Sequence, residues 1–114
     1  MKLGEKGECL AVKFLKKNGY KIIEKNYKTA IGEIDIIARD DDVLAFVEVK
    51  TRESLEFGQP FESVNSNKRR KISNVAMLYL KRLRDIPQCR FDVVSICYKS
   101  RRPQLELIKD AFEV

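Results

Sequence analysis

The sequence predicts an α/β domain in which a mixed β-sheet carries a helix on each side. The first observation behind this class is the order of the periodic segments, which runs helix, three strands, helix, strand, strand. The second is that residues 31–38 and 43–51 are apolar on both faces, as central strands covered from both sides are. The third is length, since 114 residues suffice for one packed core and not for two, so residues 1–114 are expected to form one domain.

The first predicted helix spans residues 4–18 and ends at Asn18-Gly19, a common C-terminal stop. Residues 31–38 and 43–51 are predicted to form an antiparallel hairpin around an Arg-Asp-Asp-Asp turn. The other predicted elements are strands over residues 20–27, 90–97 and 104–108, a second helix over residues 66–84, and a loop over residues 52–65.

Apolar positions define the expected core. The stripes of the two helices consist of Leu3, Gly7, Leu10, Ala11, Phe14 and Leu15, and of Ile72, Val75, Ala76, Tyr79, Leu80 and Leu83. One face of the hairpin carries Ile37, Leu44 and Phe46, and the opposite face carries Ile34, Ile36, Val43, Val47 and Val49.

Composition narrows the class of function. A net charge of +6 favours a polyanionic partner, of which nucleic acid is the commonest. The chain has no histidine, which excludes His-liganded zinc hydrolases and Ser-His or Cys-His catalysis. Phosphodiester chemistry in this protein would therefore have to use carboxylates, a lysine and a metal ion.

The sequence also indicates a location. Its apolar runs are too short to span a membrane, and its N-terminus lacks the apolar core of a signal peptide. Cys9, Cys89 and Cys97 are an odd number without Cys-x-x-Cys spacing, which is typical of reduced thiols. We expect a cytoplasmic protein without a membrane partner.

Three charged residues interrupt the apolar hairpin, namely Asp35, Glu48 and Lys50. Glu48 and Lys50 share a face, and antiparallel pairing places Asp35 opposite either Phe46 or Glu48. The three side chains can hold a hard divalent cation and activate a water molecule. A Glu-x-Lys pair is often a solvated strand face, and a buried structural ion pair is a further alternative, but charges in a strand covered on both sides favour a site.

Further candidates lie on the helices and in one turn. Glu8 is at the edge of the first apolar stripe, where it either reaches over the sheet or is a solvated acid favoured by the helix dipole. The second helix begins with Lys68, Arg69, Arg70 and Lys71, which either bind phosphate at the helix N-terminus or form a solvated basic turn. A second basic turn contains Arg101 and Arg102.

Six short motifs, in order, resemble those of the bacterial YraN-like family (UPF0102). They are Gly-Glu-Lys-Gly-Glu at residues 4–8, Gly-Glu-Ile-Asp-Ile-Ile-Ala at 32–38, Phe-Val-Glu-Val-Lys-Thr-Arg at 46–52, Phe-Gly-Gln-Pro at 57–60, Val64 with Lys68, and Arg-Phe-Asp at 90–92. The family is similar to Holliday junction resolvases and, by fold, to the PD-(D/E)xK nucleases, so the resemblance implies a restriction-endonuclease-like αβββαβ core.

The resemblance also implies roles for individual residues. Asp35 and Glu48 would be ligands of Mg²⁺ or Mn²⁺, with Glu8 and the Val49 carbonyl as additional ligands. Lys50 would orient or deprotonate the attacking water, or stabilise charge on the phosphate. Lys68 would lie near the scissile phosphate or support the site. Arg90 and Asp92 match a motif without an assigned role, and a structural ion pair is the favoured interpretation.

The leading hypothesis is a Mg²⁺- or Mn²⁺-dependent endonuclease that acts on DNA rather than RNA, with branched or damaged DNA as the substrate by analogy with resolvases. Resolvases act as symmetric homodimers, so the resemblance also implies a homodimer of this chain. Its phosphate contacts would be Lys68, Arg69, Arg70, Lys71, Arg101 and Arg102. The alternatives are a non-catalytic nucleic-acid-binding module and a subunit of a DNA repair or recombination assembly.

Overall fold

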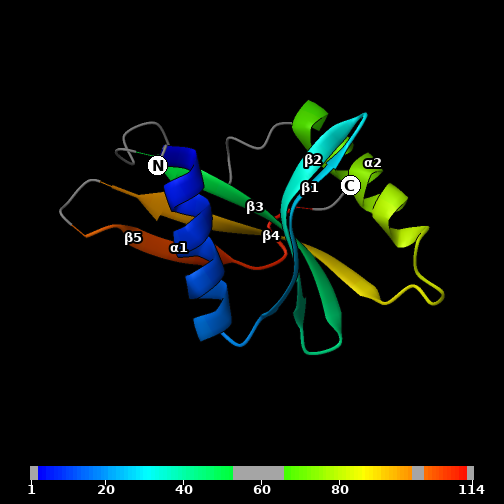
Figure 1. The fold of residues 1–114 in the computed structure, drawn as a ribbon, viewed down its shortest axis with the longest axis horizontal. Coiled ribbons are helices and arrows are strands. Elements are labelled where there is room, and N and C mark those ends of the chain that lie inside the picture. The colour runs from blue at the N-terminus through cyan, green and yellow to red at the C-terminus, as the bar shows by residue number, and fades with distance from the viewer. Residues whose placement is uncertain (1–2, 53–65, 99–101, 113–114) are drawn as a thin grey trace.

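A five-stranded mixed sheet forms the centre of the molecule (Figure 1). The computed structural model describes residues 3–52, 66–98 and 102–112. The elements, in chain order, are α1 (Leu3–Lys17), β1 (Lys21–Thr29), β2 (Gly32–Asp40), β3 (Val43–Arg52), α2 (Ser66–Leu80), β4 (Gln88–Cys97) and β5 (Gln104–Ile108). The predicted loop over residues 52–65 lies, apart from Arg52, outside the described residues.

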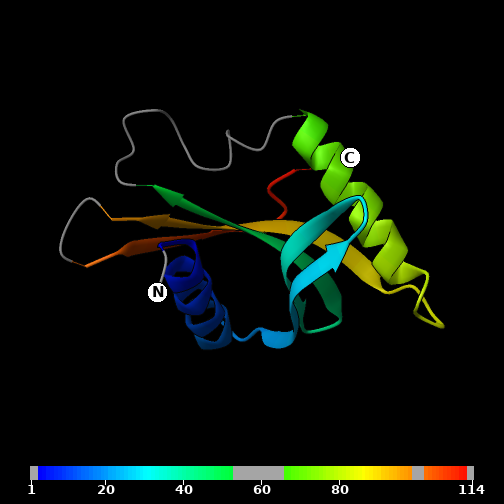
Figure 2. The ribbon, with the colours of Figure 1, turned by 45° about the horizontal axis from the view of Figure 1, so that its top comes forward.

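The strands lie in the sheet in their chain order, β1-β2-β3-β4-β5. Neighbouring strands are antiparallel except for β3 and β4, which pair in parallel from Val43↔Gln88 to Arg52↔Cys97. A parallel pair needs a crossover, and α2 lies within the connection between these two strands. Figure 2 shows α1 and α2 on opposite sides of the strands. The α/β class and the mixed sheet are thus confirmed, and they are compatible with a restriction-endonuclease-like core.

Each helix covers its own half of the core. On the α2 side, Ile37, Leu44 and Phe46 pack with the predicted stripe of the second helix, all five of whose members within α2 are buried. On the α1 side, Ala11 and Leu15 pack with Ile36 and Val47. Neither helix in the described part of the chain is long and apolar enough to cross a membrane.

The helix ends follow from local chemistry. Gly19 has a φ of 89°, and the bonds Gly19 N–H to Lys16 O and Tyr20 N–H to Leu15 O close α1 as a Schellman motif. The helix α2 ends at Leu80, so the predicted end at residue 84 was wrong. Beyond Leu80 the chain turns more tightly, with bonds from Arg82 and Leu83 to carbonyls three residues earlier.

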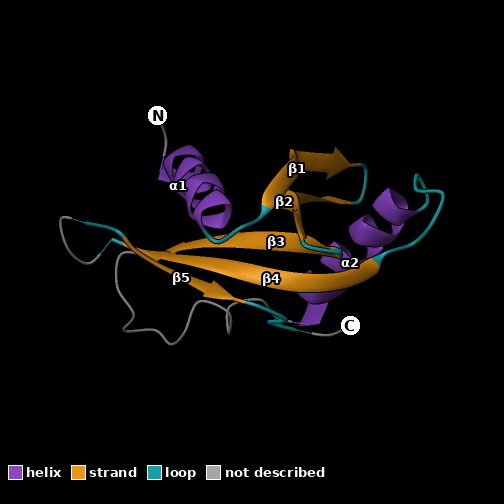
Figure 3. Ribbon diagram, turned by 90° about the horizontal axis from the view of Figure 1, so that it is seen from below, coloured by secondary structure: helices purple, strands orange, loops and turns teal. Residues whose placement is uncertain are grey.

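The β1–β2 hairpin changes direction at Asn26, which lies between the pairs Lys25↔Ile36 and Tyr27↔Ile34 and has a φ of 52°. The left-handed backbone there turns the outer part of the hairpin towards α2, as Figures 2 and 3 show. We had placed Ile34 on the same side as Ile36, and this was wrong, because Ile34 packs in the α2 cluster and Ile36 in the α1 cluster.

Candidate active site

The two strands of the predicted hairpin separate where its acids lie. The last β2–β3 pair is Ile36↔Val47, and the next step would place Asp35 opposite Glu48. The register therefore selects Glu48, not Phe46, as the residue across from Asp35. In place of a ladder bond, Asp35 Oδ2 accepts the Val49 N–H at 2.8 Å. The backbone of β3 thus fixes the Asp35 carboxylate.

Asp35 and Glu48 line one pocket of about 220 Å³ between the hairpin and the start of α2. The other residues along its walls are Gly32, Glu33, Lys68, Lys71 and Ile72. A Cβ at Gly32 would lie 3.3 Å from Val75 Cγ2, so the hairpin approaches the helix closely. The pocket is built by the bend of β1 and β2 over α2.

Glu48 is the most buried charge of the pocket, with 9% of its surface exposed, and two ammonium groups contact it. Lys68 Nζ lies 3.0 Å and Lys50 Nζ 3.5 Å from Glu48 Oε1. Lys50 comes from the same strand two residues later, whereas Lys68 reaches down from the first turn of α2. The ion pair with Glu48 is compatible with Lys68 supporting the site, and its contact with the scissile phosphate stays a prediction.

Burial and neighbouring charges shift the pKa values of three residues of the site, Asp35, Lys50 and Lys68. Burial, and then the charge of Glu48, raises the pKa of Asp35 to about 7, against the bond from the Val49 N–H, which lowers it. Burial and the neighbouring Lys68 lower the pKa of Lys50. Burial alone would also lower the pKa of Lys68, but its contacts with Lys50 and Glu48 raise it. A bound cation would stabilise the ionised form of Asp35, which burial and Glu48 disfavour.

Glu8 is not among the residues that line this pocket. It is half-buried on α1 and lines a separate groove between α1 and β1. Its charge nevertheless contributes to the raised pKa of Asp35, so the two acids are within electrostatic range. In the described part of the chain, no three acidic or cysteine side chains converge closely enough to hold a metal by themselves.

The predicted phosphate contacts are dispersed. Lys71 is exposed on the pocket wall, and Arg70 is exposed on α2. The Arg69 guanidinium lies over the Phe112 ring at 5.4 Å from its centroid. Arg102 is exposed just before β5, and Arg101 lies outside the described residues.

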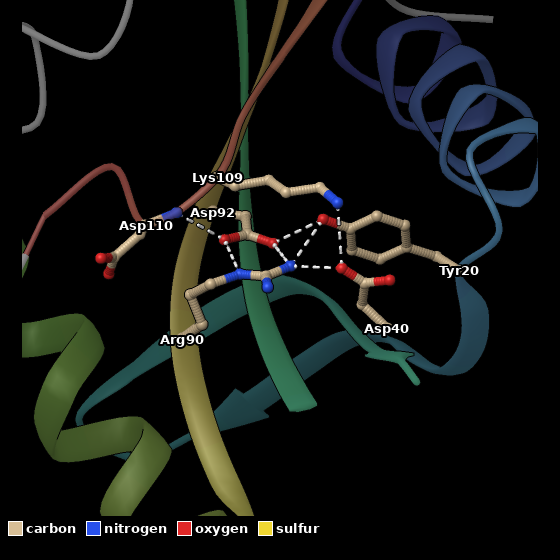
Figure 4. A network of polar contacts seen from close by, with 6 residues as sticks. All are labelled: Tyr20, Asp40, Arg90, Asp92, Lys109 and Asp110. Atoms are coloured by element: carbon tan, nitrogen blue, oxygen red, sulfur yellow. Dashed lines mark hydrogen bonds and ion pairs between the residues drawn. The ribbon is translucent and has the colours of Figure 1, made fainter. Parts of the chain in front are cut away.

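Arg90 and Asp92 form an ion pair, as the favoured interpretation held, at the centre of a larger network (Figure 4). Asp92 is fully buried and accepts bonds from Arg90 Nε at 2.8 Å, Arg90 Nη2 at 2.9 Å and Tyr20 Oη at 2.7 Å. Arg90 Nη2 also donates to Asp40 Oδ2 at 2.8 Å, and the Asp110 N–H donates to Asp92 at 2.9 Å. The network ties β4 to the β2–β3 turn, several rungs from Glu48.

The sequence alone did not identify Asn26, Tyr20, Asp40 or Lys109, whose Nζ donates to Asp40 Oδ2 at 3.1 Å. Asn26 carried a usable signal, because asparagine tolerates the left-handed region and is unusual inside a strand. The network partners carried none, because Tyr20 and Arg90 are 70 residues apart in sequence.

Comparison with known proteins places the chain in one family. The model of the uncharacterised protein family UPF0102 matches residues 7–96. A UPF0102 protein of Geobacter metallireducens is 49% identical, with 98% of this chain and 93% of the relative covered. UPF0102 proteins of Syntrophus aciditrophicus and Clostridium perfringens are 45% and 47% identical, with 100% and 98% of this chain and 91% and 94% of the relatives covered. The chain therefore belongs to the family UPF0102.

Proposed function

We propose that this protein is a Mg²⁺- or Mn²⁺-dependent endonuclease that acts on DNA. The observation that carries the proposal is that Asp35 and Glu48 line the same pocket, where Lys50 and Lys68 form ion pairs with Glu48. Two carboxylates and a lysine are the groups that histidine-free phosphodiester hydrolysis requires. The resemblance to resolvase-like nucleases assigns the same three residues, Asp35, Glu48 and Lys50, to catalysis.

The donor set fits a hard divalent cation. Mg²⁺ keeps several waters and is commonly held by one or two carboxylates plus substrate phosphate, so Asp35 and Glu48 suffice as its protein ligands. The raised pKa of Asp35 supports this fit, because burial, and then the charge of Glu48, disfavour its ionised form, which a bound cation would stabilise. The Val49 carbonyl and Glu8 stay proposed as additional ligands. When bound, the cation lowers the pKa of a water and neutralises phosphate charge.

We assign separate roles in the reaction to Asp35, Lys50 and Lys68. Asp35 is held by the Val49 N–H, so its carboxylate needs little reorganisation to bind a ligand. Lys50, whose pKa is lowered by burial and by Lys68, is suited to accept a proton from the attacking water. Lys68, whose pKa is raised, stays charged and is suited to contact a phosphate oxygen once it leaves Glu48.

Binding to DNA would depend on contacts between basic side chains and the phosphates of the DNA backbone. Lys71 on the pocket wall and the exposed Arg70 extend the positive surface from the pocket along α2. Such contacts neutralise phosphates and carry no sequence information. The expected specificity is therefore for the shape of the DNA, and branched or damaged DNA is the substrate class that we propose.

One observation favours a non-catalytic nucleic-acid-binding module instead. Glu48 already has two ammonium partners, at 3.0 and 3.5 Å, so it is partly neutralised without any metal. A cluster of this kind can serve as a structural ion network under a DNA-binding surface. It would also suit a subunit of a repair assembly in which a partner cleaves.

The test is cleavage of a labelled panel of single-stranded, duplex, flap and four-way-junction DNA, together with RNA, in Mn²⁺ or Mg²⁺. We expect cleavage by the wild type that is lost in Asp35→Ala and Lys50→Ala. Asp42→Ala and Lys21→Ala, which alter exposed residues outside the pocket, should cleave normally. Cleavage that persists in both site variants refutes the proposal, and binding without any cleavage supports the binding module.

A further inference from the structure

A second hollow, of about 420 Å³, runs between α1 and the edge strand β1. Its α1 wall includes Cys9, Val12, Lys13 and Lys16, and its β1 wall consists of Lys25 and Asn26. We call it the α1–β1 groove. None of the expected roles derived from the sequence used this groove, although Glu8 lies in its wall.

The α1–β1 groove is positively charged. Lys13 and Lys16 are three residues apart and share a face of α1, while Lys25 comes from the opposite wall. All three are exposed, and none forms an ion pair with any residue that the structure describes. Among the residues that the structure describes, Glu8 is the one acid that lines the groove, so these walls carry an excess of two positive charges.

The groove lies beside the candidate active site, although the two hollows share no lining residue. Asn26 lies opposite Asp35 in the β1–β2 pairing, between the pairs Lys25↔Ile36 and Tyr27↔Ile34. Glu8 at the other wall is close enough for its charge to act on Asp35. A strand bound at Asp35 and Glu48 could therefore continue over Asn26 into the groove.

We propose that the α1–β1 groove binds the sugar-phosphate backbone of a nucleic-acid strand that leaves the candidate active site. The inference rests on the proposed function for its starting point. Along α1, Glu8 to Lys16 spans about 12 Å, at about 1.5 Å per residue. Along the axis of B-DNA, one strand has a phosphate every 3.4 Å or so, so a groove of this length parallel to the duplex axis faces about three phosphates. Three cations from two walls match that number.

The first test is the salt dependence of DNA binding in EDTA, where cleavage cannot occur. Replacing Lys13, Lys16 and Lys25 together by alanine should reduce the magnitude of the slope of log K against log salt by about 2 to 3. Each phosphate contact contributes about 0.7 to 0.9 to this magnitude. A matched triple variant replaces Lys17, Lys21 and Lys28 by alanine. These exposed residues lie in the same two elements, α1 and β1, but outside the groove, so the variant removes the same charge. It should keep the wild-type slope.

The second test needs no charge variant. Cys9 is exposed in the groove, whereas Cys89 is half-buried and Cys97 buried, so iodoacetamide should modify Cys9 first. Duplex DNA at ten times its Kd should slow this modification about tenfold. Polyglutamate at the same charge concentration should not. Equal protection by polyglutamate would overturn the assignment to nucleic acid.

The outcomes separate the two proposals. If DNA binds but Cys9 reacts at its free rate and the groove variant keeps the wild-type slope, the groove proposal is wrong and the nuclease proposal stands. If DNA protects Cys9 and the slope falls, but no substrate is ever cleaved, the groove stands and the nuclease proposal fails. Absence of DNA binding under all conditions overturns the groove as well.

Discussion

The raised pKa of Asp35 implies that this carboxylate destabilises the metal-free fold when it is ionised. Between pH 3.8 and about 7 the folded protein keeps a proton at Asp35 that the unfolded chain has released. The free energy of unfolding therefore falls as the pH rises through this window. We expect Asp35→Asn, which removes the charge and keeps an oxygen to accept the Val49 N–H, to abolish this loss.

The size of this effect on the free energy of unfolding follows from the shift in the pKa of Asp35. Moving the pKa from 3.8 to about 7 corresponds to about 4 kcal/mol, at 1.36 kcal/mol per pH unit. We expect Asp35→Asn and the wild type to be equally stable below pH 3.8, and the variant to gain steadily up to pH 7. Above pH 7 the difference should stay constant. Because solvent and neighbouring groups relax, 4 kcal/mol is an upper bound.

The assay is urea denaturation followed by circular dichroism, in EDTA, at pH values from about 2.8 to about 8, which is roughly one unit on either side of the window. The exposed turn residue Asp42, changed to asparagine, serves as the control and should track the wild type. A difference between Asp35→Asn and the wild type that does not change with pH would refute the account of a crowded, buried acid.

Three further expectations concern packing and charge. Asp92→Asn should cost about 3 kcal/mol in urea denaturation, because it leaves Arg90 partly unpaired in a buried network, and should leave Mn²⁺ affinity unchanged. Gly7→Ala places a Cβ 2.6 Å from Thr51 Cγ2 and should cost about 1 to 2 kcal/mol, most of which Thr51→Ser should restore in a double-mutant cycle. Lys68→Met should raise Mn²⁺ affinity about fivefold by calorimetry, since an ammonium worth about 1 kcal/mol no longer competes for the same carboxylate; unchanged affinity would contradict this.

Local periodicity predicted the elements well because each one satisfies its own pattern. The strand over residues 104–108 has the predicted bounds, and the stripe of α2 is buried as expected. The end of α2 was misplaced because Leu83 continues the apolar period and packs against the core although the chain has already left the helix. Periodicity reports burial, and it cannot distinguish a helical turn from a tighter one that buries the same side chain.

The candidate site could be predicted in part. Charges in a strand that is apolar on both faces marked Asp35, Glu48 and Lys50, since only a partner or a function makes such charges tolerable. The bond from Val49 to Asp35 could not be foreseen, because it requires the ladder to stop after Ile36. The same part of the sheet contains the left-handed backbone of Asn26, on the neighbouring strand β1.

Contacts between distant segments were beyond the reach of sequence patterns. The Tyr20–Arg90–Asp92 network joins β4 to the connection between α1 and β1, and no spacing in the chain encodes it. The ion pair of Lys68 with Glu48 could not be predicted, because the distance between the two residues depends on how α2 docks on the sheet.

The central claim is that Asp35 and Glu48 together hold a divalent cation, and calorimetric titration of Mn²⁺ at pH 8 tests it most directly. At this pH Asp35 is ionised in the folded protein, given its pKa of about 7. We expect one equivalent of Mn²⁺ to bind the wild type and Asp42→Asn, and no binding to Asp35→Asn or Glu48→Gln. Binding that survives in either site variant, or no binding to the wild type, would contradict the claim.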